Sequence, residues 1–318
     1  MMNNTINILT CTVLFLLTIA SYSCSNKSND NKLIIQNKTQ IEKNKHITYA
    51  VHVNAKTPYE LYLDDILIDR FYENNMNRST DLNTYLLNNG THKLKIRYLP
   101  LSDSQDGLLD PKDIIFNKDS RWHIYFVSLN KDPEAPLGYT NEIDYGSSAL
   151  NIITPPKKVP FWEQEWDLEI KDLPYKLKGW SESEDLSKVN QDELKKEVVA
   201  FFEEQRLLLN EGKVDEYLQL GLKKDQELIV ATYGEDLEYY NSQERKKNIL
   251  RAKGDMLPLE NYTLELFANG RLATLIIASG QYKNWSALLS KSEKGRVSGW
   301  GILVHKPKGS SQFEIIRK

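Results

Sequence analysis

Residues 161–173 read FWEQEWDLEIKDL, and this stretch decides how the first half of the chain folds. Trp162, Trp166, Leu168 and Ile170 all fall at even-numbered positions, while Glu and Asp residues fill the odd-numbered positions between them. A period of two is typical of a strand with one face buried and the other in water. We therefore predict a β-strand here, with both tryptophans in the core.

The same alternation recurs upstream. Residues 47–53 alternate in this way, 59–71 read as a hairpin around an Asp-Asp turn, and further strands are expected at 91–99 and from residue 121. The hairpins resemble those of immunoglobulin-like modules in exported bacterial proteins. Six or more strands without a helical period predict an Ig-like, antiparallel β-sandwich domain over residues 46–178.

A helical period begins after a polar segment, residues 179–188, which we predict to be a linker. Asn190, with Glu193 three residues later, is typical of a capping box, and Gly212 is typical of a helix end. Three helical segments are predicted, at residues 190–212, 214–220 and 223–252, the last interrupted at Gly234.

Strands return after Pro258. Asn269-Gly270 lies between two apolar runs, which is the strongest short signal for a hairpin, and three more strands are expected behind it. Helices followed by such a meander predict an α+β domain over residues 189–318, with the helices packed on an antiparallel sheet. This order of elements resembles the NTF2-like and cystatin-like superfamily. The resemblance implies a curved sheet that wraps a long helix and leaves a conical pocket.

The N-terminal segment is typical of an exported protein. An uncharged apolar run of about 15 residues, 6–20, is shorter than the roughly 20 residues that a membrane span requires, and small serines lead from it to Cys24. We predict a signal peptide over residues 1–23 and a flexible tether over residues 24–45.

The residues before Cys24 resemble the lipobox of bacterial lipoproteins, although Ser21 stands where that family usually has leucine. The resemblance implies that Cys24 is acylated, with chains such as palmitate, and that the protein faces the periplasm from the outer membrane of a bacterial cell envelope. Secretion with a free thiol is the alternative. Cys11 leaves with the signal peptide, so no intrachain disulfide is expected in the mature protein.

Composition narrows the range of partners. The chain has 41 Lys and Arg residues against 44 Asp and Glu, a net charge of −3, and this balance gives no general affinity for nucleic acid. We expect the membrane, reached through the lipid, and a protein as partners.

The sequence shows no catalytic motif, and we predict no enzyme, no metal site and no cofactor. The five histidines are too scattered to suggest ligands. His305 is the only histidine in the α+β region, and spacing assigns it no acidic partner. Four aspartates lie on one loop without the spacing of a calcium motif, and we interpret them as solvated: Asp103, Asp106, Asp110 and Asp113.

One cluster of aromatic and acidic residues is a candidate partner-binding surface. Tyrosine offers a large contact area, and carboxylates attract a basic partner. The alternative is an exposed helix face. The candidate partner-binding residues are Tyr233, Glu235, Asp236, Tyr239 and Tyr240.

Five tryptophans also suggest carbohydrate stacking, but we expect most of them in the core and Trp180 at the linker. The tryptophans concerned are Trp162, Trp166, Trp180, Trp285 and Trp300.

These patterns favour a non-catalytic envelope lipoprotein that acts by binding a partner. Its architecture resembles that of immunity proteins that protect a bacterium from a periplasmic toxin. Two alternatives stay open: a structural or assembly component of an envelope complex, and a ligand-binding NTF2-like protein.

Overall fold

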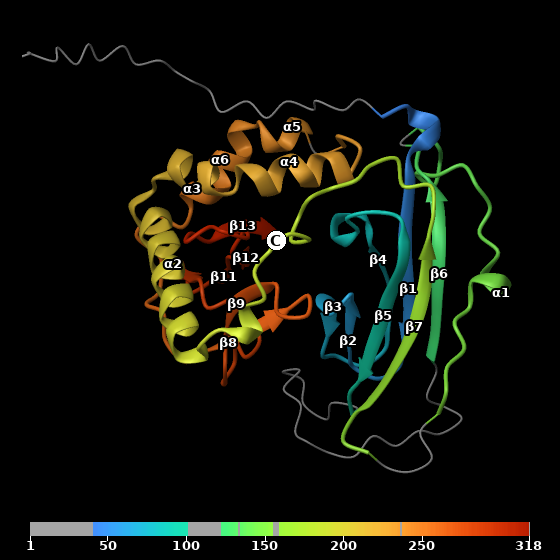
Figure 1. Cartoon of the computed structure of the whole chain (residues 1–318), viewed down its shortest axis with the longest axis horizontal. Coiled ribbons are helices and arrows are strands. Elements are labelled where there is room, and N and C mark those ends of the chain that lie inside the picture. The colour runs from blue at the N-terminus through green and yellow to red at the C-terminus, as the bar shows by residue number, and fades with distance from the viewer. Residues whose placement is uncertain (1–40, 101–121, 133, 155–158, 236, 318) are drawn as a thin grey trace, which may run out of the picture. The chain divides into compact units, whose positions relative to one another are not determined.

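The computed structural model describes residues 41–100, 122–132, 134–154, 159–235 and 237–317 (Figure 1). The first part of this range is built mainly of antiparallel strands, and the second combines helices with antiparallel strands. The predicted β-rich fold in two parts is confirmed at this level.

Seven strands of the first part form two antiparallel sheets, one ordered β4-β1-β6 and the other β3-β2-β5-β7. The strands are β1 (Ile47–Ala55), β2 (Tyr59–Leu63), β3 (Ile66–Phe71), β4 (Met76–Asp81), β5 (Gly90–Tyr98), β6 (Trp122–Asn130) and β7 (Trp162–Ile170). Short helical turns are η1 (Lys43–Lys45), η2 (Asn83–Tyr85) and α1 (Tyr145–Ser148).

The two sheets share one hydrophobic core. Val51 of β1 and Ile96 of β5 are fully buried in it, and the rings of Tyr98 and Trp122 stack with their centroids 4.2 Å apart. Burying an aliphatic side chain of this size stabilises the fold by about 1.5–3 kcal/mol. The alternating residues of β1, β2 and β5 therefore form the core, as their pattern predicts.

Strand β7 confirms the prediction for residues 161–173, with one difference. Leu168 and Ile170 are buried, but Trp162 and Trp166 are only partly buried. Each indole nitrogen donates a hydrogen bond to a carbonyl of the 151–153 segment, at 3.0 and 2.9 Å. The two rings therefore cover that segment at the edge of the core.

Strand β4 has no counterpart among the predicted strands. Its sequence, MNRSTD, lacks apolar alternation because β4 pairs only with β1 and leaves most of its side chains in water. Backbone pairing to an edge, rather than side-chain burial, forms this strand.

The helices of the second part follow the predicted order. They are η3 (Leu186–Lys188), α2 (Gln191–Glu211), α3 (Val214–Leu220), α4 (Leu222–Ala231), α5 (Leu237–Tyr240) and α6 (Gln243–Leu250). The side chain of Asn190 caps α2 by accepting from two backbone amides, and Gly212 ends it at φ 71°. The predicted break at Gly234 separates α4 from α5, with Gly234 at φ 82°.

The second core lies between α2 and a sheet ordered β13-β12-β9-β8. Val198 and Phe202 of α2 are fully buried together with Leu275 of β9. Strands β10 and β11 form a separate two-stranded sheet. The strands are β8 (Tyr262–Phe267), β9 (Leu272–Ile277), β10 (Leu289–Lys291), β11 (Val297–Gly299), β12 (Leu303–His305) and β13 (Glu314–Arg317). One predicted strand, 297–305, is thus two strands in different sheets.

The segment 179–188 alternates between buried and exposed residues. Trp180, Ser183 and Leu186 are all at least nine-tenths buried, although the segment is polar in sequence. The first core also takes in residues of the second part, such as Ala268 and Ile316. The division into domains at 46–178 and 189–318 stays a prediction.

Candidate binding site

A pocket of about 480 Å³ lies where strand β3 meets the second part of the chain. Its volume is in the range of sites for small molecules. Apolar side chains form much of its lining, and polar groups are few. The lining residues are Leu67, Arg70, Phe267, Thr274, Ile276, Asn284, Trp285, Ser286, Gly299, Gly301, Ile302 and Leu303.

Trp285 lines this pocket with a side chain that is 45% exposed. A tight turn presents the ring: the amide of Trp285 donates to the carbonyl of Tyr282 at 2.9 Å, and Asn284 adopts φ 68°. Asparagine tolerates this left-handed conformation better than most residues. The ring of Tyr282 lies 5.4 Å from the indole, so the platform has lateral support.

A glycine lets the backbone lie close to the indole. A Cβ atom at Gly299 would stand 3.6 Å from Cε3 of Trp285, an ordinary contact distance. Since Gly299 has no side chain, the space beside the ring stays open.

The amide group of Asn284 belongs to a partly buried chain of hydrogen bonds. Its Nδ2 donates to the hydroxyl of Tyr72 at 2.7 Å, and Tyr72 donates to Glu60 at 2.9 Å. Tyr62 donates to the other oxygen of Glu60 at 2.8 Å. Burial and the Glu60 carboxylate raise the pKa of Tyr72 to about 12, so this hydroxyl stays a donor at neutral pH. The chain fixes the orientation of Asn284 in the pocket.

Arg70 brings a positive charge to the pocket, but carboxylates offset it. Burial raises the pKa of the half-buried Glu265, and Arg70 acts against that rise, which places the two charges within electrostatic reach. Arg70 therefore supplies guanidinium donors to the pocket lining, while Glu60 and Arg97 act on Glu265 outside that lining.

A second hollow, of about 250 Å³, adjoins the pocket at Gly299, which lines both. Its walls are mostly polar. They are formed by Asn248, Arg251, Asp255, Ser290, Ser292, Arg296, Ser298, Gly299 and Trp300. The two hollows therefore adjoin at Gly299, the last residue of β11.

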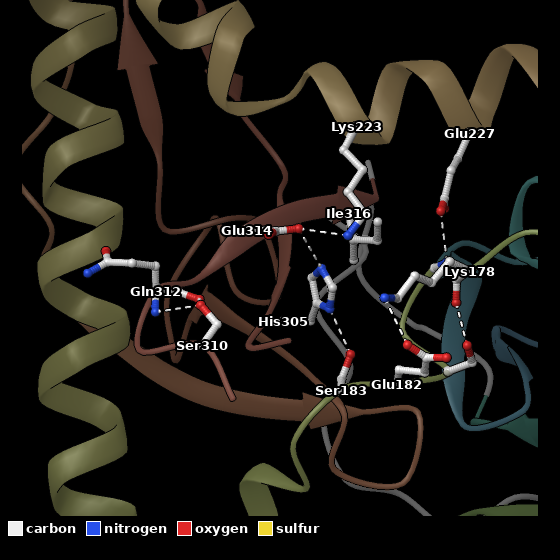
Figure 2. Close-up of polar contacts among 12 residues, drawn as sticks. Lys178, Glu182, Ser183, Lys223, Glu227, His305, Ser310, Gln312, Glu314 and Ile316 are labelled. Carbon is white, nitrogen blue, oxygen red and sulfur yellow. Dashed lines mark hydrogen bonds and ion pairs between the residues drawn. The ribbon is translucent and has the colours of Figure 1, made fainter. Parts of the chain in front are cut away.

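A buried Ser–His–Glu arrangement lies elsewhere, between the 178–188 segment and strands β12 and β13 (Figure 2). The hydroxyl of Ser183 and Nδ1 of His305 are 2.7 Å apart, and Nε2 of His305 lies 3.4 Å from Glu314. These groups have the composition of a nucleophile, a base and an orienting acid. Ser183 is only 1% exposed and the His305 side chain 2%, so a substrate does not reach them.

Burial and the charges around His305 determine its protonation state. Burial, aided by the nearby ammonium of Lys223, lowers the pKa of His305 to about 4. Although burial opposes ionisation of Glu314, the Lys223 ammonium 2.8 Å away holds the pKa of that carboxyl below its usual value. A neutral imidazole thus joins the Ser183 segment to the sheet, and we interpret the arrangement as structural.

The predicted partner-binding residues differ in their environments. Tyr233 is partly buried, stacks on His46 at 4.4 Å, and donates its hydroxyl hydrogen to the carbonyl of Ile47. Asn83 donates to the same hydroxyl at 3.1 Å. Tyr233 therefore holds the helical region against the first sheet.

The other candidates of this group lie nearer the surface. Tyr239 is 45% exposed and Glu235 is exposed, while the ring of Tyr240 lies 4.7 Å from the Arg245 guanidinium. Asp236 lies outside the described residues. Partner binding at this segment stays a prediction.

Several other predictions also fall outside the described residues: the signal peptide, Cys24, most of the tether, and the loop with Asp103, Asp106, Asp110 and Asp113. Within the described ranges, no three His, Cys, Asp or Glu side chains are grouped in a way that would hold a metal ion. The helices described here include none with the length and apolar character needed to cross a membrane.

The sequence placed Trp285 among five tryptophans that suggest carbohydrate stacking, with most of them expected in the core, and it did not indicate Arg70 or Asn284. The sequence carries one usable signal, the polar turn KNWS, in which a tryptophan stands among hydrophilic residues. Arg70 lies more than 200 positions from that turn, and only the fold brings them together.

No family model, no curated protein and no solved structure matches this chain. The functional argument therefore depends on the geometry of its own residues.

Proposed function

We propose that the protein is a lipid-anchored binding protein of the bacterial cell envelope, attached through Cys24 and acting without catalysis. The observation that carries the binding function is the pocket at Trp285, which joins an exposed indole to an oriented amide and a guanidinium. A well-formed pocket with a few convergent polar groups is a default location for a ligand.

This proposal is tested by native mass spectrometry of the full chain after incubation with a soluble envelope extract. We expect a bound small molecule on the unmodified protein and its loss from the Trp285→Ala variant. The same bound mass on both proteins, or none on either, would contradict the pocket as the binding site.

The lipid anchor is tested separately. Cells that express the unmodified protein are labelled with an alkyne fatty acid and compared with cells that express Cys24→Ser. We expect label and membrane retention only with Cys24, because the thiol is the acyl acceptor. Retention of the variant in membranes would contradict the anchor.

We further propose that the first part is an Ig-like sandwich and the second an NTF2-like or cystatin-like unit. Two antiparallel sheets that share one hydrophobic core support the first assignment. A long helix packed on a four-stranded sheet supports the second.

A protein partner is the second candidate for what is bound, as in an immunity-type or assembly protein. The exposure of both Tyr239 and Glu235 favours it. Capture of envelope proteins by the full chain, compared with its Tyr239→Ala/Glu235→Ala variant, tests this surface.

A further inference from the structure

We propose that the pocket at Trp285 binds a neutral pyranose sugar within a glycan chain. This inference rests on the proposed binding function and adds the chemical class of the ligand. Four features of the site support it: the indole, the polar groups beside it, their charge balance, and the adjoining hollow.

The indole offers a flat surface to a flat ligand. Trp285 has Tyr282 at its side and Gly299 close to one edge, and it is 45% exposed although it lines a pocket. The face of an aromatic ring carries partial negative charge. The C–H bonds on one side of a pyranose ring present weakly positive hydrogens to such a face, so stacking is favourable.

The polar groups beside the indole match hydroxyl groups. Asn284 uses its amide hydrogens on Tyr72, and no hydrogen bond within the described chain engages its amide oxygen. This oxygen accepts, and Arg70 donates. A sugar hydroxyl can satisfy both kinds of group because it is donor and acceptor at once. An alkyl chain in the same place would leave the amide oxygen of Asn284 without a partner, at a cost in free energy.

The balance of charge favours a neutral sugar over an acidic one. Arg70 and Arg97 both act on Glu265. Glu60, which is paired with Arg97 at 3.6 Å, adds a second carboxylate, so positive and negative charges are balanced beside the pocket. An anionic ligand would meet these carboxylates as well as the guanidinium.

The adjoining hollow favours more than one sugar unit. Gly299 lines both hollows, and the second contains serine, asparagine and arginine side chains around Trp300. A second ring that follows the first past Gly299 would find hydrogen-bonding groups there. A disaccharide should therefore bind more tightly than the corresponding monosaccharide.

The test is calorimetric titration of the full chain in detergent with cellobiose, methyl glucoside, glucuronic acid and dodecanoate. We expect cellobiose to bind at least about tenfold more tightly than glucuronic acid. Trp285→Ala should weaken cellobiose binding about tenfold or more, and Trp285→Phe, which keeps an aromatic face, should weaken it less.

Two further variants separate the ligand site from folding. Gly299→Leu should weaken cellobiose more than methyl glucoside, because its side chain would fill the space between the hollows. Tyr145→Ala, which removes a 49% exposed ring outside the pocket, is the matched control and should bind as the unmodified chain does. Circular dichroism verifies that each variant is folded.

The outcomes distinguish the ligand class from the binding function. Dodecanoate binding that depends on Trp285, without any sugar binding, would overturn the sugar while leaving the pocket as a binding site. If glucuronic acid binds more tightly than cellobiose, the proposal that the ligand is a neutral sugar is overturned. Cellobiose binding that survives both Trp285 substitutions would overturn the proposed stacking, and no binding of any probe would count against the pocket function itself.

Discussion

The Arg317 junction and the Trp285 pocket both bring together residues from the two parts of the chain, but their chemistry differs. Arg317 is 1% exposed, donates to Thr84 at 2.7 Å and to Glu227 at 3.0 Å, and lies 4.8 Å from the ring of Trp180. Trp285 is 45% exposed. The side chains at the Arg317 junction thus bind partners within the chain, whereas those at the Trp285 pocket leave groups available for a ligand.

The largest expected effect comes from breaking the junction. Arg317→Ala would leave the Glu227 carboxylate, which is 12% exposed, without its cationic partner. Removing one partner of a buried pair costs about 3–5 kcal/mol. Urea unfolding of the full chain should show this loss in its free energy of unfolding. The double variant Arg317→Met/Glu227→Gln should recover part of it, because no buried charge is then unpaired. A loss below about 1 kcal/mol in the single variant would contradict a committed junction.

Adding one methyl group at Gly179, next to Trp180 of the junction, tests how tightly this region is packed. Gly179 adopts φ 47°, and a Cβ atom there would stand 2.4 Å from Cδ2 of Leu87. Strain at a left-handed position and overpacking each cost about 1–3 kcal/mol. We expect Gly179→Ala to lower the free energy of unfolding by about 2 kcal/mol or more. Unchanged stability would show that this segment is loosely packed.

Acid should destabilise the fold through His305, which joins Ser183 to Glu314 close to the Arg317 junction. Its pKa is about 4 in the fold and about 6.5 in an unfolded chain, so the unfolded state binds more protons between these values. Stability should be nearly full above about pH 7, be lower by about 2 kcal/mol at about pH 5, and continue to fall towards about pH 4. The slope is measured by thermal or urea unfolding at several pH values. His305→Gln removes the titrating group. If the free energy of unfolding of this control falls as steeply with pH as that of the unmodified chain, a group other than His305 causes the effect.

The smallest effect is expected in the pocket. A Cβ atom at Gly299 meets its nearest neighbours at 3.6 and 3.8 Å, which are ordinary contacts. We expect Gly299→Ala to change the free energy of unfolding by less than about 0.5 kcal/mol, in contrast to the same substitution at Gly179. Thermal unfolding of the two variants side by side makes the comparison. A cost at Gly299 as large as at Gly179 would show that the pocket is packed as tightly as the junction.

The sequence predicts the elements whose burial follows a regular period. Helix α2 begins after Asn190 and ends before Gly212, as its capping residues indicate, and the hairpin between β8 and β9 forms around Asn269-Gly270. These signals are local, so reading neighbouring residues is enough. Strand β4 escaped prediction because its pairing with β1 leaves no pattern in its own side chains.

The contacts that matter most for the site come from residues far apart in the chain. Arg70 and Trp285 line one pocket, and Thr84 accepts from Arg317, yet no periodicity relates either pair. His305 shows the same limit at shorter range. It pairs in register with Glu314 across β12 and β13, and this register depends on where each short strand begins.

Hydrogen exchange of the full chain, measured by mass spectrometry with and without saturating cellobiose, tests the central claim most directly. The account predicts that without ligand the peptides of 178–186 and 314–317 exchange slowly and those of 280–286 and 299–302 exchange faster. Cellobiose should slow exchange only in the peptides of 280–286 and 299–302. Protection that appears at residues 233–240 instead, or nowhere in the chain, would contradict a ligand site at Trp285.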